Sequence, residues 1–105
     1  MDKRLHRRFP TQFRSSFSSA YIAEGEGQVI NLSLRGCCIN STMDVKPGTT
    51  LQLQLQVFSD KPPVQIDRAI VHWRATTYFG VEFIGLSPES EARLQDIVKQ
   101  LELQS

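Results

Sequence analysis

The sequence Leu51-Gln52-Leu53-Gln54-Leu55-Gln56-Val57 alternates aliphatic and amide side chains without interruption. Successive side chains of a β-strand point to opposite faces, so this period of two predicts a strand with one buried face and one solvated face. A helix would spread the four aliphatic residues around its circumference. The stretch therefore indicates a β-sheet that exposes one side to water.

Other β-rich segments flank this strand, and turn residues separate them. Further strands are predicted at residues 17–23, 28–32, 37–39, 64–74 and 79–84. Turns are predicted at Glu24–Gly27, where the glycines tolerate positive φ, and around Lys46, Pro47 and Gly48. Six short strands within about 70 residues indicate a closed or nearly closed antiparallel β-barrel.

The end of the chain changes to a helical period, because its aliphatic residues are spaced three and four apart: Leu94, Ile97, Val98 and Leu101. Ser87 is a candidate N-cap, and Pro88 suits the first helical position. We therefore expect an all-β fold with a C-terminal helix over residues 87–102, whose apolar stripe covers one mouth or edge of the barrel.

The 105 residues suffice for one domain, and the composition is that of a soluble globular protein with a formal net charge of +1. Within residues 1–105 we predict a flexible basic arm at 1–15, the barrel at 16–86 and the helix after it. No apolar stretch is long enough for a transmembrane helix, so we expect a cytoplasmic protein without membrane insertion. Cys37 and Cys38 would point to opposite faces of a strand, which argues against a disulfide and a two-cysteine metal clamp.

The sequence contains little that could catalyse a reaction. It has no nucleophile elbow, no glycine-rich phosphate loop and no histidine pair at metal spacing, since His6 lies in the arm and His72 in a predicted strand. We expect His72 and its neighbour Trp73 to be ordinary strand residues, although either could line a ligand site. The chain is therefore predicted to be a binding protein and not an enzyme, with neither a metal nor a cofactor.

The arm concentrates positive charge, with five basic residues and one acidic residue among the first 14. Arg4, Arg7 and Arg8 could turn their guanidinium groups toward one anion. Guanidinium pairs its hydrogen bonds on phosphate oxygens and on the O6 and N7 edge of guanine. The alternative for a charged terminus is that water merely solvates it.

A polar loop is predicted at Asn31-Leu32-Ser33-Leu34-Arg35-Gly36. Asn31 offers an amide, Ser33 offers a hydroxyl, and Gly36 permits a tight turn or the close approach of a ligand. Taken alone, this segment could equally be a simple polar turn.

Taken together, the arm and the loop resemble the paired signature of the PilZ domain family. Arg4-Leu5-His6-Arg7-Arg8 looks like its arginine, three residues, arginine motif, and Asn31 to Gly36 looks like its Asp or Asn, x, Ser, x, x, Gly motif. The segment Phe79-Gly80-Val81-Glu82-Phe83 is similar to the last strand of such domains, and the strand count suits their six-stranded barrel. The resemblance covers nearly the whole chain.

The resemblance implies a receptor for the bacterial second messenger cyclic di-GMP that passes its signal to a protein effector. The ligand-binding residues are then expected to be Arg4, Arg7, Arg8, Asn31, Ser33, Arg35 and Gly36. Two registers of the arginine motif stay open: one uses Arg4 and Arg8, and the other begins at Arg7 and places Thr11 where the second arginine belongs. We favour the first register, because it keeps both arginines without an insertion.

Two other functions remain as alternatives. One is a ligand-blind adaptor that uses the same barrel for protein contacts, which the Thr11 register would favour. The other is a nucleic-acid-binding barrel with a basic arm that follows phosphates. The predicted strand faces argue against nucleic acid, because they carry glutamine and serine where such a platform needs basic and aromatic residues.

Overall fold

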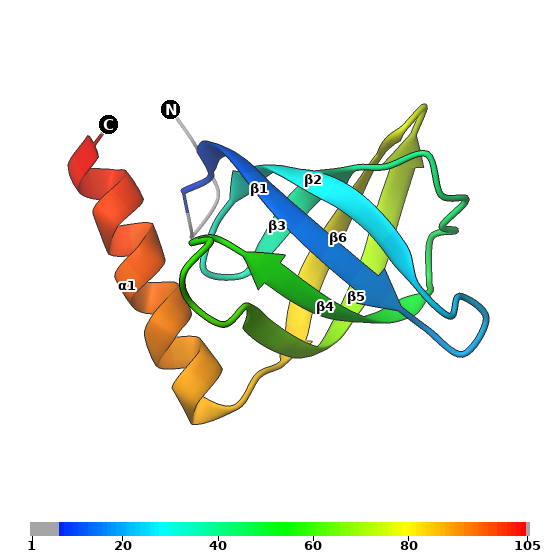
Figure 1. Cartoon of the computed structure of the whole chain (residues 1–105). Coiled ribbons are helices and arrows are strands. Elements are labelled where there is room, and N and C mark those ends of the chain that lie inside the picture. The colour runs from blue at the N-terminus through cyan, green and yellow to red at the C-terminus, as the bar shows by residue number, and fades with distance from the viewer. Residues whose placement is uncertain (1–6, 105) are drawn as a thin grey trace.

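The computed structural model describes residues 7–104, which form six strands and one helix (Figure 1). The elements are β1 (Phe9–Ser18), β2 (Gly25–Leu32), β3 (Gly36–Asn40), β4 (Thr50–Gln56), β5 (Val64–Ala75), β6 (Tyr78–Gly85) and α1 (Pro88–Gln104). All neighbouring strands pair antiparallel, and the order β1-β2-β3-β6-β5-β4 closes into a barrel. The predicted six-stranded barrel with a C-terminal helix is confirmed.

The alternating segment lies as predicted in β4. Leu51, Leu53 and Leu55 are buried in the barrel, while Gln52 and Gln54 between them face water. Strands β3 to β6 begin and end within one residue of their predicted limits. The core at the centre of the barrel includes an edge-to-face contact between Phe17 and Phe79, whose ring centroids are 5.5 Å apart.

The first strand differs from the prediction. Strand β1 runs from Phe9 to Ser18, so residues 9–15, which were assigned to the flexible arm, belong to the barrel. The predicted strand at 17–23 is wrong beyond Ser18, because the chain turns there and Tyr21 is 95% exposed. The outer face of β1 carries polar residues and Arg14, so its sequence resembled a flexible arm. Phe9 and Phe17 on the inner face pack in the core and hold the strand in the barrel.

The glycines of the predicted turn serve another purpose. Gly25 and Gly27 lie in β2, and among the described residues only Gly48 is a glycine with positive φ, at 90°. A Cβ on Gly25 would overlap the ring of Phe17, and a Cβ on Gly27 would come within 2.6 Å of Ile39 Cγ2. These two positions therefore need glycine because core side chains pack directly on the backbone. Gly48 lies in the turn predicted around Pro47.

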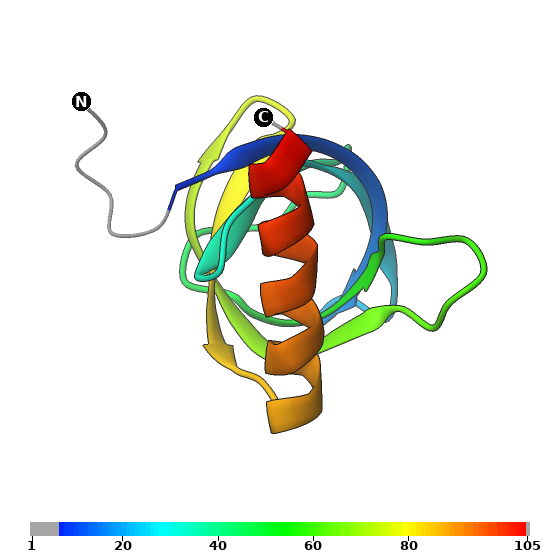
Figure 2. The same cartoon turned by 90° about the vertical axis from the view of Figure 1, so that its left-hand side faces the viewer.

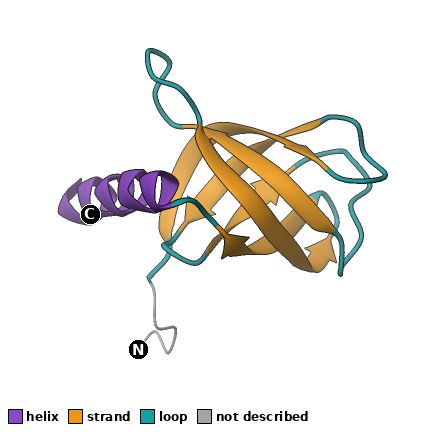
Figure 3. Ribbon diagram, turned by 90° about the horizontal axis from the view of Figure 1, so that it is seen from below, coloured by secondary structure: helices purple, strands orange, loops and turns teal. Residues whose placement is uncertain are grey.

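Helix α1 lies across one mouth of the barrel (Figures 2 and 3). Its buried residues Leu94, Ile97 and Val98 join the barrel core, as the helical period predicted. The helix begins at Pro88, where the Ser87 hydroxyl accepts a hydrogen bond from the Ser90 N–H at 3.1 Å. It ends at Gln104, two residues beyond the predicted limit. Within residues 7–104, no helix is both long and apolar enough to span a membrane.

Candidate functional site

Arg8 and Asn31, 23 positions apart in sequence, meet on the outside of the barrel. A guanidinium nitrogen of Arg8 donates a hydrogen bond of 3.0 Å to Oδ1 of Asn31, and both residues are half-buried. The pairing of β1 with β2 places Pro10 opposite Asn31, which brings Arg8 beside this amide. Because guanidinium has five N–H donors, the bond to Asn31 leaves the fork able to hold an anion.

Asn31 begins a row of residues that crosses four strands. Asn31 on β2 is paired with Cys38 on β3, Cys38 with Gly80 on β6, and Gly80 with Trp73 on β5. The sequence neighbours Leu32, Cys37, Phe79 and Val81 all point into the core, so the row itself lies on the outer face. We call Asn31, Cys38, Gly80 and Trp73 the cross-strand row.

The strand ladders are irregular where they meet this row. Register shifts occur between Pro10 and Phe13 in β1, between Val29 and Asn31 in β2, and between Val71 and Trp73 in β5. An extra residue in a strand bends it and changes the direction of the neighbouring side chains, and such bulges are frequent beside binding sites. The irregular pairing distinguishes this face from the regular ladder between β1 and β4.

Trp73 and Gly80 form the far end of the row. The indole lies on Gly80, since a Cβ there would overlap the indole Nε1, and Trp73 remains 44% exposed. The result is a fixed aromatic surface at the same level as Asn31. Gly80 was predicted in the last strand and Trp73 as a strand residue that could line a ligand site, but their contact with each other was not predicted. Counting back from the two-residue turn Thr76-Thr77 would have paired them.

Cys38 occupies the middle of the row and is 4% exposed. Burial raises the pKa of its thiol, and the nearby positive charge of Arg8 opposes this shift. Burial also raises the pKa of Cys37, whose side chain points into the core. Both thiols are free, as expected for cysteines on opposite faces of a strand. Cys38 therefore places an uncharged side chain between Asn31 and Gly80 in the row.

The predicted polar loop is shorter than expected, because Asn31 and Leu32 belong to β2 and Gly36 to β3. Ser33 is buried, and its hydroxyl accepts hydrogen bonds from the N–H groups of Arg35 and Gly36, each 3.2 Å long. A Cβ on Gly36 would overlap the Val81 carbonyl oxygen. Ser33 and Gly36 therefore hold the loop in shape and against β6, as a polar turn requires.

The remaining predicted arginines differ in position. Arg7 is exposed, and its Cζ lies 4.9 Å from the centroid of the Phe9 ring, beside Arg8. Arg35 is exposed at the tip of the β2–β3 loop, residues 33–35. Arg4 lies outside the described residues. His72 is an exposed strand residue, and its Nε2 is 2.7 Å from Oε1 of Glu82.

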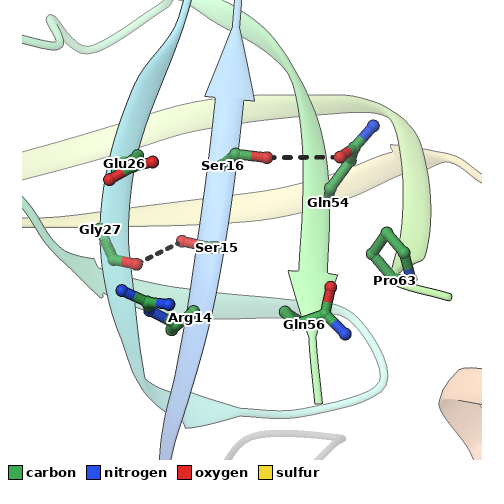
Figure 4. A pocket seen from close by; sticks show the side chains of 8 residues that line it. All are labelled: Arg14, Ser15, Ser16, Glu26, Gly27, Gln54, Gln56 and Pro63. Carbon is green, nitrogen blue, oxygen red and sulfur yellow. Dashed lines mark hydrogen bonds between the residues drawn. The ribbon is translucent and has the colours of Figure 1, made fainter. Parts of the chain in front are cut away.

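A separate polar hollow of about 250 Å³ lies on the outer faces of β1, β2 and β4 (Figure 4). It is lined by Arg14, Glu26 and Gln56, and a hydrogen bond of 3.4 Å from Ser16 to Gln54 crosses its floor. None of the predicted ligand-binding residues within 7–104 lines this hollow. Its Arg14 therefore provides a comparison with Arg8, since both belong to the same basic segment.

Solved structures share this fold. The motility inhibitor MotI/DgrA of Bacillus subtilis has a TM-score of 0.79 and 14% identity over 100% of this chain and 53% of that chain. YcgR of Escherichia coli, in complex with c-di-GMP, has a TM-score of 0.77 and 21% identity over 99% of this chain and 48% of that chain. This chain therefore spans about half the length of these two proteins.

The separate PilZ domain of Escherichia coli YcgR, with c-di-GMP, is similar in length to this chain, and the match covers 98% of this chain and 94% of that chain. Its TM-score is 0.76 and its sequence identity is 15%. No curated protein matches the sequence. The sequence model of the PilZ domain matches residues 2–100. This match agrees with the closed barrel and with the resemblance of the arm and the loop to the family signature. The chain belongs to the PilZ domain family.

Proposed function

We propose that this chain is a non-catalytic receptor for cyclic di-GMP and binds it on the outer face formed by Arg8 and the cross-strand row. The bond from Arg8 to Asn31 is the observation that carries this proposal, because it joins the two predicted motifs in one site. Two related structures in the family are named as complexes with c-di-GMP, which supports the choice of ligand.

The chemistry of the face suits the two phosphates and two guanines of this ligand. Arg8 and Arg7 donate charge-assisted hydrogen bonds to phosphate oxygens or to the O6 and N7 edge of guanine. Asn31 holds the Arg8 fork in place through Oδ1, and its amide N–H groups are available for a base. Trp73 offers a flat ring at the same level, and stacking of a base on an aromatic ring contributes about 1–3 kcal/mol.

Calorimetric titration with cyclic di-GMP tests this proposal. Arg8→Ala removes a charged donor, a loss of about 1.5–3 kcal/mol, so we expect binding to weaken roughly 10- to 150-fold. Arg14→Ala is the matched control, because this exposed arginine of β1 belongs to the same basic segment as Arg8 but lines the separate hollow. Its affinity should equal that of the native chain.

Three results would count against the receptor. Absence of heat with the native chain favours the ligand-blind adaptor. Equal losses in Arg8→Ala and Arg14→Ala would mean that charge alone attracts the ligand, and oligonucleotides binding as well as cyclic di-GMP would indicate a nucleic-acid barrel.

Arg4 is part of the proposal through the register of the arginine motif. In the favoured register Arg4 and Arg8 are the paired arginines, and Arg7 is an additional donor. In the described part of the chain, the Thr11 hydroxyl donates to the Val29 carbonyl at 2.8 Å, so this side chain is engaged with the β2 backbone. This contact supports the Arg4 and Arg8 register.

Alanine substitutions separate the two registers in the same titration. Arg4→Ala should abolish binding, while Arg7→Ala should only weaken it. The reverse order would assign the motif to Arg7 and Thr11.

Trp73 supplies a second, independent readout, because it is the only tryptophan of the chain. If a guanine stacks on the indole, cyclic di-GMP will quench its fluorescence with the same midpoint as the heat of binding. An unchanged emission spectrum at saturation would remove Trp73 from the site without affecting the role of Arg8.

A further inference from the structure

A second concave surface lies on the side of the β2–β3 loop that faces the helix. It has a volume of about 350 Å³, and its lining is mixed: Leu34, Phe83, Leu86 and Leu94 supply the apolar part, and Arg35, Glu91 and Gln95 supply the polar part. Figure 2 shows α1 crossing the mouth of the barrel. The lining residues place this surface between the helix, the β2–β3 loop and the end of β6. We call it the helix groove.

Ile84 extends the apolar lining onto the outside of the barrel. In β6, Phe83 pairs with Ala69 and Gly85 pairs with Arg68, so Ile84 is an extra residue without a partner in β5. The bulge turns its side chain outward, where it is 45% exposed. Ile84 is therefore continuous with the apolar residues Leu34 and Leu86, and together they form a contiguous exposed apolar patch that marks a protein contact surface.

The charges at the groove favour an acidic partner. Arg35 lines it, and Arg68 lies along Gly85 beside Ile84. Within residues 7–104, Arg68 has no hydrogen-bond or ion-pair partner. Glu91 also lines the groove, but it belongs to the first turn of α1, where a carboxylate interacts favourably with the helix dipole.

The groove and the proposed ligand face share one rigid connection. The β2–β3 loop follows directly on Asn31 and Leu32, and its Arg35 carbonyl accepts a hydrogen bond of 2.8 Å from the Phe83 N–H. The Ser33 N–H donates to the Gly36 carbonyl at 2.9 Å, which closes the loop on itself. One side of this loop therefore meets the Arg8 site, and its tip forms a wall of the groove.

We propose that the helix groove docks a segment of a partner protein that carries aliphatic side chains flanked by carboxylates. The aliphatic side chains contact Leu34, Leu86 and the exposed Ile84. The carboxylates pair with Arg68 at the rim. Docking itself needs no ligand, and only its role as the output of a cyclic di-GMP receptor rests on the proposed function.

Amide NMR of the full chain without cyclic di-GMP tests the docking site with three capped peptides, Asp-Leu-Leu-Asp, Lys-Leu-Leu-Lys and Asp-Ser-Ser-Asp. We use about 1 mM peptide, because a site with a dissociation constant of about 1 mM is then half saturated. We expect Asp-Leu-Leu-Asp alone to shift the signals of Leu34, Ile84 and Leu94. Arg68→Glu should weaken this binding roughly fivefold, and the control Arg14→Glu should leave it unchanged.

Several outcomes would overturn the docking proposal. One is that no peptide shifts the amide signals of the groove. Another is that the lysine or the serine peptide shifts them as much as Asp-Leu-Leu-Asp does. A third is that Arg68→Glu and Arg14→Glu weaken peptide binding equally. Groove shifts that follow protein concentration without peptide would make the occupant a second copy of the chain. Arg68 and Arg14 are both exposed, so both variants should fold, and a thermal melt checks this. Failure to bind cyclic di-GMP leaves this result unaffected, so the two proposals fail separately.

Discussion

Thr76 adopts a backbone conformation that threonine disfavours. It is the first residue of the two-residue turn between β5 and β6, and its φ is 55°. The left-handed region costs a residue with a Cβ about 1–2 kcal/mol, and a two-residue hairpin turn with positive φ at its first position prefers glycine there. The turn places Ala75 opposite Tyr78, and so sets the register that brings Trp73 onto Gly80.

Thr76→Gly is therefore expected to raise the free energy of unfolding by about 0.5–1 kcal/mol, since the strain relieved exceeds the entropic cost of a glycine. Chemical denaturation measures the change. Thr77→Gly is the control, because Thr77 has no positive φ and should lose stability. Equal losses in both variants would show that Thr76 is not strained.

The two thiols should resist alkylation in the folded chain. The thiolate is the reactive form, so a raised pKa lowers its fraction at a given pH, and burial raises the pKa of both Cys37 and Cys38. At pH 9 we expect iodoacetamide to modify neither thiol in the native protein and both in denaturant, as measured by mass spectrometry. Rapid native alkylation of Cys38 would place it on an open surface, contrary to its 4% exposure.

At the scale of single elements, the helix start was predictable because its determinants are local. Ser87 and Pro88 mark the beginning of α1, and the structure has the cap bond from the Ser90 N–H to the Ser87 hydroxyl at 3.1 Å. Strand β4 was equally predictable from the sequence, because its period of two is uninterrupted.

Ser87→Ala removes this cap and should lower the free energy of unfolding by about 1 kcal/mol. The exposed Ser59 in the β4–β5 loop gives a matched control, and Ser59→Ala should change it by less than about 0.5 kcal/mol. Thermal unfolding monitored by circular dichroism compares the two. A Ser87→Ala variant as stable as the control would mean that packing on the barrel alone fixes the start of the helix.

The beginning of β1 could not be predicted from local sequence. Phe9 is buried because β2 and the core surround it, but in the sequence it follows a run of basic residues. For the same reason Gly25 resembled a turn residue. Position 25 requires glycine because the ring of Phe17 packs against its backbone, and this contact forms only when β1 and β2 pair.

At the scale of the whole molecule, barrel closure assembles the site. Arg8 and Asn31 were each predictable as motif residues, because the family signature preserves their order and spacing. Cys38, Gly80 and Trp73 join them only through the pairing of four strands with bulges in the ladders. Bulge positions depend on how the sheet twists and closes, and single-sequence patterns do not specify them.

A cyclic di-GMP titration followed by amide and indole NMR of the full chain tests the ligand face most directly. Binding at the Arg8 site predicts shifts at Asn31, Cys38, Gly80 and the Trp73 indole, with little change at Ser16 and Gln54 around the separate hollow. Arg8→Ala should reduce these shifts, and Arg14→Ala should not. The proposal would be contradicted if saturating ligand left the cross-strand row unchanged, or if the largest shifts appeared around Arg14.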